Sequence, residues 1–183
     1  MTNYFAFARQ AIASDSAGIL LDAGCGSLLF TAQTYLECQR PILACDQSLE
    51  MLRRAKSRLR KLTGSVPENI FLLQADLGVL PFRPASFRTT LCMNVLHHFP
   101  DAEGLLRGLK TLLSADGQLY LTSLVKSSRL IGDHYLNALH RRGDLVRPRT
   151  AVELETLLAG PFAGSVSCRT EGNMAYATAV RES

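Results

Sequence analysis

The chain has 183 residues, 47% of them hydrophobic and 20% charged, with a formal net charge of +4. These values are those of one ordinary soluble globular domain, and so mild a charge does not demand a nucleic-acid partner. Five scattered cysteines argue against a disulfide framework or a zinc site, and no apolar run is long enough to span a bilayer, so we expect a cytoplasmic protein.

Predicted strands and helices alternate along the first two thirds of the chain. Short apolar runs that end in turns predict strands, and apolar stripes at helical spacing predict helices. This alternation predicts a parallel sheet with helices on both faces. In chain order, we expect a helix at 4–13, a strand at 19–22, a helix at about 28–38, a strand at 42–45, a helix from 48 to 62, strands at 70–73 and 89–94, a helix from 101 to 113 and a strand at 118–124.

The last third of the chain departs from this alternation. The stretch 126–150 is polar, basic and aromatic without a clear strand, and we interpret it as a substrate-side insertion. A helix at 151–158, ended by Gly160-Pro161, precedes two strands at 165–169 and 175–180 that we expect to form an antiparallel hairpin. The predicted fold is therefore α/β: a Rossmann-like three-layer sandwich over residues 1–183, with a mostly parallel seven-stranded sheet and a C-terminal antiparallel hairpin.

The stretch 19–31, ILLDAGCGSLLFT, has the order of a nucleotide-binding unit: an apolar strand, a glycine turn and a segment that could begin a helix. Gly24 and Gly26 permit a tight turn and a close approach of the backbone to a ligand. Leu29 stands where a dinucleotide fingerprint needs its third glycine. The pyrophosphate cradle is therefore incomplete, which disfavours a dehydrogenase.

Acidic residues end three successive predicted strands: Asp22, Asp46 and Asp76. A carboxylate at the end of the second strand suits the two hydroxyls of a ribose. The alternative is that Asp46 only caps the helix that begins near Ser48. A dinucleotide leaves Asp76 without a role, whereas a ligand with adenine, ribose and an amino-acid tail accounts for all three carboxylates.

At this point the sequence resembles a known family, the class I S-adenosylmethionine-dependent methyltransferases. The resemblance covers nearly the whole chain and looks closest to the group that includes the ubiquinone and menaquinone biosynthesis methyltransferases. It implies transfer of a methyl group from S-adenosylmethionine to a small molecule, but it does not name the acceptor. The motifs that carry it are LLDAGCG at 20–26, CDQSLEMLRRAK at 45–56, QADLGVLPF at 74–82, NVLHHF at 94–99 and SADGQLYLTS at 114–123.

The resemblance also implies a set of cofactor contacts. The glycine turn would line the methionine moiety, Asp46 would hold the ribose, and Asp76 would accept from the adenine amino group. One departure from the family pattern is Leu28, which stands where a further glycine is frequent and is expected to push the turn outward or change its path. The implied contacts, in chain order, are Asp22, Gly24, Cys25, Gly26, Asp46, Gln47, Met51, Asp76, Leu77 and Asn94.

His97 and His98 follow the fourth predicted strand and are candidates for a general base, which is needed only if the acceptor arrives protonated. The alternative is that one of them packs against the sheet or bonds the backbone. No grouping of histidine, aspartate or glutamate has the spacing of metal ligands, so we expect no metal.

The insertion 126–150 is the expected source of substrate selection, with Tyr135, Arg147 and Arg149 as candidate contacts. We predict that Arg147 or Arg149 binds a carboxylate of the acceptor. Tyr4 of the leading helix could contribute as well. The alternative is that 131–139 forms an amphipathic helix whose charged side chains meet solvent.

Two other functions remain open at the level of sequence. The first is a non-catalytic S-adenosylmethionine-binding partner or sensor. The second is an RNA methyltransferase that uses the basic helix 53–61, although the chain lacks the N-P-P-Y-type signature after the fourth strand and has Asn94-Val95-Leu96-His97 there instead. The sequence does not indicate the oligomeric state.

Overall fold

The computed structural model describes residues 2–14, 18–127, 130–163 and 165–182. Its strands are β1 Leu20–Ala23, β2 Ile42–Asp46, β3 Ile70–Gln74, β4 Phe87–Met93, β5 Leu113–Leu124, β6 Val166–Glu171 and β7 Met174–Val180. Its α-helices are α1 Thr2–Ala13, α2 Ala32–Tyr35, α3 Leu49–Thr63, α4 Ala102–Leu112, α5 Leu130–Arg141 and α6 Ala151–Phe162, with short 3-10 turns η1 Leu77–Val79 and η2 Leu96–His98.

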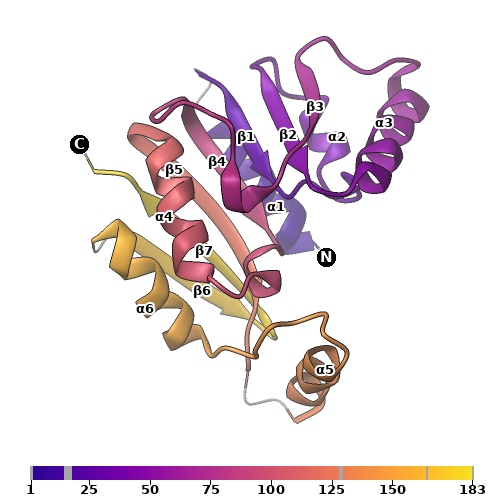
Figure 1. Cartoon of the computed structure of the whole chain (residues 1–183). Coiled ribbons are helices and arrows are strands. Elements are labelled where there is room, and N and C mark those ends of the chain that lie inside the picture. The colour runs from indigo at the N-terminus through magenta and orange to yellow at the C-terminus, as the bar shows by residue number, and fades with distance from the viewer. Residues whose placement is uncertain (1, 15–17, 128–129, 164, 183) are drawn as a thin grey trace.

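The strands form one seven-stranded sheet in the order β3-β2-β1-β4-β5-β7-β6 (Figure 1). Pairing is parallel from β3 to β5, and β7 is antiparallel to both β5 and β6. The strand order reverses between β1 and β4, and ligands of open parallel sheets bind at the carboxyl ends of the strands near such a switch. This topology confirms the predicted mostly parallel sheet and its C-terminal hairpin.

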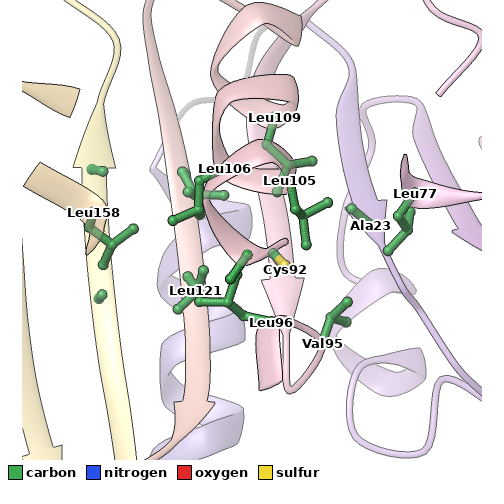
Figure 2. Close-up of a cluster of buried hydrophobic side chains, with 14 of the residues drawn as sticks. Ala23, Leu77, Cys92, Val95, Leu96, Leu105, Leu106, Leu109, Leu121 and Leu158 are labelled. Atoms are coloured by element: carbon green, nitrogen blue, oxygen red, sulfur yellow. The ribbon is translucent and has the colours of Figure 1, made fainter. Parts of the chain in front are cut away.

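Helices cover both faces of the sheet and enclose two hydrophobic cores. Residues of α4 and α6 pack on one face, and residues of α1, α2 and α3 pack on the other (Figure 1). Figure 2 shows Leu105, Leu106 and Leu109 of α4 directed toward Cys92 of β4 and Leu121 of β5. A fully buried leucine stabilises a fold by about 1.5–3 kcal/mol relative to an exposed one. Burial of these side chains therefore holds the helices against the two faces of the sheet.

The ends of α3 agree with the expected sequence signals. The Ser48 side chain accepts a hydrogen bond from the Met51 N–H, as an N-cap does, and Gly64 ends the helix in a left-handed conformation with φ of 81°. Leu52, Ala55 and Leu59 form its buried stripe.

Three predicted boundaries were wrong. The helix expected over 28–38 is only the single turn of α2; it cannot begin at Leu28, whose φ is positive, and it ends at Tyr35. Strand β5 begins at Leu113 rather than 118, with the Asp116-Gly117 turn included as an irregularity opposite β4. Helix α6 continues through Pro161 because Phe162 is buried in the core, and it ends at the left-handed Ala163.

The stretch 126–150 contains α5, which lies beyond the carboxyl end of β5 (Figure 1). A single parallel bridge joins Lys126 to Thr150 at the two ends of this stretch. The helix agrees with the alternative interpretation of 131–139. Among the described residues, no helix has the length and apolar character needed to cross a bilayer.

Candidate cofactor site

A cavity of about 400 Å³ lies at the carboxyl ends of β1, β2 and β4, beside the switch in strand order. Nine of the ten predicted cofactor contacts line it, and Asp76 does not. The lining residues are Tyr4, Asp22, Gly24, Cys25, Gly26, Ser27, Leu29, Phe30, Thr31, Asp46, Gln47, Met51, Leu77, Met93, Asn94, Val95, His98 and Phe99.

Gly24 is needed for the path of the loop after β1. Its φ is +84°, and a Cβ added to it would lie 2.3 Å from Val95 Cγ2. Hydrogen bonds hold the loop against β2, since the N–H groups of Gly24 and Cys25 both donate to the Cys45 carbonyl, at 2.8 and 2.9 Å. The loop backbone therefore lies directly at the wall of the cavity.

Leu28 does not close the site. It adopts a left-handed conformation with φ of 54°, the region that a glycine would occupy without strain. Its side chain is 1% exposed and packs into the core on the α1–α3 face, away from the cavity lining. The leucine is thus accommodated by turning its side chain inward, and the altered path shortens α2 rather than filling the cavity.

Asp22 is buried at the base of the cavity, and only one of its two carboxylate oxygens accepts a hydrogen bond. Its Oδ2 accepts a hydrogen bond from the Tyr35 hydroxyl at 2.7 Å, whereas its Oδ1 has no partner among the described residues. Burial raises the pKa of Asp22 to about 7; the Tyr35 hydrogen bond opposes this rise, and the charge of Asp46 adds to it. A cationic donor in the cavity would satisfy Oδ1 and favour the ionised form.

Asp46 connects the glycine loop to α3. Its Oδ2 accepts from the Gly26 N–H and its Oδ1 from the Ser48 N–H, both at 2.8 Å. Each carboxylate oxygen keeps a further lone pair, and the side chain lines the cavity. The two interpretations of Asp46 are therefore compatible, because the residue orders the backbone near the start of α3 and still faces the cavity.

Asp76 and Leu77 differ in position although they are neighbours. The Asp76 side chain accepts from the Gly78 N–H at 2.8 Å, caps η1 and is exposed, whereas Leu77 is buried and lines the cavity. Asn94 also lines the cavity, in a left-handed conformation with φ of 59°, and its N–H donates to the Thr122 carbonyl at 3.0 Å.

The two histidines have different environments. His98 lines the cavity, while His97 is buried outside it, with ring centroids 4.2 Å apart. Burial lowers the pKa of His97 to about 4, assisted by the nearby His98 and Arg149. His97 Nδ1 has no hydrogen-bond partner in the described part of the chain.

The predicted acceptor contacts lie outside the cavity lining. Tyr135 is 59% exposed on α5, and Arg147 forms an ion pair with Glu153 at 3.1 Å. Arg149 is buried in a separate groove. Their role toward an acceptor stays a prediction.

Three aromatic side chains, Tyr4, Phe30 and Phe99, form one wall of the cavity, and of these the sequence had suggested only Tyr4 as a possible substrate contact. The rings of Tyr4, in α1, and Phe30, in the loop after β1, meet edge to face with their centroids 5.2 Å apart. Phe99 follows η2 and also lines the cavity. Phe30 and Phe99 are isolated aromatic residues in loops and carry no periodic signal, so only the fold reveals that they gather beside Tyr4. No cluster of three or more histidine, cysteine, aspartate or glutamate side chains suited to a metal occurs in residues 2–14, 18–127, 130–163 and 165–182.

Residues 21–121 match the family model described as a methyltransferase domain. The chain belongs to the class I S-adenosylmethionine-dependent methyltransferases. It is similar to a ubiquinone biosynthesis O-methyltransferase of Xanthomonas campestris pv. campestris, at 30% identity over 140 residues that make up 70% of this chain and 56% of the relative. The chain thus spans little more than half the length of that relative.

Solved structures of methyltransferases share this fold. A Bacillus halodurans protein assigned to the methyltransferases has a TM-score of 0.80 at 14% identity, with 99% of this chain and 100% of that chain covered. A geranyl diphosphate methyltransferase, solved with GPP and sinefungin, has a TM-score of 0.76 at 11% identity, with 98% and 77% covered. At such identities, these structures show the fold alone.

Proposed function

We propose that the chain binds S-adenosylmethionine and transfers its methyl group to a small-molecule acceptor. The observation that carries the proposal is the unsatisfied, buried Asp22 Oδ1 at the wall of the cavity. An α-amino group is the kind of donor that this carboxylate lacks, and buried polar groups are almost always paired. Family membership supports the same cofactor.

The remaining residues fit the rest of the cofactor. Asp46 has lone pairs left for two ribose hydroxyls after it accepts from Gly26 and Ser48. Met51 and Leu77 offer apolar contacts to an adenine ring. We keep Asp76 as a proposed contact for the adenine amino group because it directly precedes Leu77. The proposed set is completed by Gly24, Cys25, Gly26, Gln47 and Asn94.

The cofactor supplies an activated methyl group on a sulfonium, so the protein must orient the acceptor and exclude water. We place the acceptor against the aromatic wall of Tyr4, Phe30 and Phe99, which borders the cavity. His98 is our candidate base for an acceptor that arrives protonated, because it lines the cavity and His97 does not. The names of the Xanthomonas relatives favour a hydroxyl acceptor.

Four basic side chains of α3 lie apart from this site, whereas Arg58 donates to the carbonyl of Ser27 in the loop that lines the cavity. Arg53, Lys56, Arg60 and Lys61 line a groove of their own and none of them lines the cavity. A small-molecule acceptor is therefore favoured over RNA. RNA binding would show strongly salt-dependent affinity, which the small-molecule function does not predict.

Thermal unfolding with S-adenosylmethionine, S-adenosylhomocysteine and NAD tests the proposal. Each sulfur ligand at 100 times its Kd should stabilise the protein by about 2.7 kcal/mol, whereas NAD should not. Asp22→Asn should weaken both sulfur ligands by about tenfold or more, because a charged hydrogen bond is lost. The exposed Asp144→Asn variant serves as the matched control.

Two results would contradict parts of the proposal. If neither sulfur ligand shifts the unfolding midpoint, the cofactor assignment fails. If both bind but no S-adenosylhomocysteine forms with any member of a panel of hydroxylated aromatic acceptors, the non-catalytic sensor becomes the better function.

A further inference from the structure

A second groove, of about 490 Å³, lies between the first turns of α4 and α6. It shares no lining residue with the cofactor cavity. Its walls include Pro100 before α4, the side chains of Arg147 and Arg149, and Val152 and Leu157 of α6. Methyl transfer as proposed above gives this groove no role.

Arg149 has an unusual environment for a charged side chain. It is only 6% exposed, its Nη1 is buried without a hydrogen-bond partner, and it forms no ion pair with a described residue. Burial, assisted by the charge of Arg147, lowers the pKa of Arg149, and the charge of Glu153 opposes this fall. A buried guanidinium is costly unless an anion pairs with it, because its hydration is lost without compensation.

The starts of two helices border the same groove. Asp101 and Thr150 are the N-caps of α4 and α6, which have 11 and 12 residues. The caps satisfy the amides of Gly104 and Glu153. The N–H groups of the preceding helical residues have no intrahelical acceptor, so each helix presents partial positive charge here.

The acidic side chains of the groove are already engaged. Asp101 accepts from the Gly104 N–H at 2.8 Å, and Glu103 pairs with Arg107 at 2.9 Å. Glu153 pairs with Arg147 at 3.1 Å and accepts from the Thr150 N–H at 2.7 Å. Glu153 attracts Arg149 electrostatically, but none of these carboxylates forms an ion pair or hydrogen bond with the Arg149 side chain, so this cation is left for a ligand.

We propose that this groove is an oxyanion site, in which Arg149 binds the carboxylate or phosphoryl group of a small molecule. A guanidinium presents paired N–H donors that match either group. Val152 is 70% exposed and, with Leu157 and Pro100, offers an apolar surface to the remainder of the molecule. The site is separate from the cofactor cavity and does not depend on methyl transfer.

Calorimetric titration of the whole chain, without cofactor and at constant chloride, tests the proposal. The probes are inorganic phosphate, hexanoate and the neutral analogue hexanamide. We expect at least one anion to bind, hexanamide not to bind, and Arg149→Met to weaken the anion by about tenfold or more. Arg54→Met, on the exposed surface of α3, should leave the anion affinity unchanged.

The stability of Arg149→Met is informative as well. Removal of an unpaired buried charge should leave the unfolding midpoint equal to or above that of the wild type. If this variant fails to fold, Arg149→Lys replaces it and should bind the anion more weakly, because the planar fork is lost. Binding of phosphate alone indicates a phosphoryl ligand, and binding of hexanoate alone indicates an apolar carboxylate.

The proposal is overturned if neither anion binds the wild type, or if the Arg149 variant binds as tightly as the wild type. The second result would place the anion elsewhere, for example on the basic surface of α3. Because no cofactor is present in the titration, neither result bears on S-adenosylmethionine binding.

Discussion

The Tyr35 hydroxyl donates a hydrogen bond to Asp22 Oδ2 at 2.7 Å, inside a region where both side chains are buried. The pair links the single turn of α2 to the end of β1, directly beneath the cavity. The hydrogen bond opposes the rise in the pKa of Asp22 that burial causes. Tyr35 therefore helps to keep the carboxylate available in its ionised form.

Tyr35→Phe should weaken S-adenosylhomocysteine binding in a pH-dependent manner. Loss of the hydrogen bond raises the pKa of Asp22 further, so more of the protein carries a neutral Asp22 at pH 7. We expect the affinity to fall several-fold at pH 7 and to recover toward the wild-type value near pH 8.5, as measured by calorimetry.

Tyr120→Phe is the matched control, because it removes another largely buried hydroxyl, bonded to Gln118 at 2.8 Å, outside the cavity. An equal loss of affinity at both pH values in Tyr35→Phe would show that Tyr35 acts only through packing.

Asp22 and His97 should contribute opposite slopes to the pH dependence of stability. The pKa of Asp22 is raised to about 7 in the folded state, so the free energy of unfolding falls as pH rises from about 4 to 7. The pKa of His97 is lowered to about 4, so the same free energy rises as pH increases from about 4 to 6.5. Each slope is at most about 1.4 kcal/mol per pH unit, and the two largely cancel.

Urea unfolding between pH 4 and 7 separates the two contributions. In Asp22→Asn, the free energy of unfolding should increase with pH over this range. In His97→Gln, it should decrease with pH. Identical profiles for the two variants would contradict the assigned environments.

Much of this site was predictable because strand ends converge whenever a sheet is parallel. Apolar runs that end in Asp22 and Asp46 place both carboxylates at one edge, and the glycines between them indicate a ligand. Tyr35 was not predictable as a partner of Asp22, because their contact depends on the interrupted helix after Leu28. Arg149 was predicted as a ligand contact from its charge and its place in the 126–150 insertion, and only the packing of α4 against α6 shows that its side chain is buried without a hydrogen-bond partner.

Gly24→Ala should destabilise the protein more than alanine at other left-handed glycines. Every such substitution incurs about 1–2 kcal/mol of backbone strain. At Gly24, the new Cβ would also meet Val95 Cγ2 at 2.3 Å, whereas Gly64, with φ of +81°, has no atom within 4 Å of the added Cβ. Gly64→Ala is therefore the control in urea unfolding. A double variant with Val95→Ala should recover part of the additional loss, and equal stability of the two alanine variants would exclude the close contact.

Leu28 provides the sharpest test of backbone strain, because a substitution to glycine should be tolerated better than one to alanine. Both substitutions remove a side chain that is 1% exposed and should cost about 2–5 kcal/mol through the cavity left behind. Alanine retains the strain of the left-handed conformation with φ of 54°, whereas glycine adopts it freely. We therefore expect Leu28→Gly to be more stable than Leu28→Ala by about 1 kcal/mol in urea unfolding.

In an ordinary helix, glycine is instead less stable than alanine by about 0.5–1 kcal/mol. The pair Leu59→Gly and Leu59→Ala, at a buried position within α3, should show that ordinary order. If glycine were the less stable substitution at both positions, the loop would not hold Leu28 under strain.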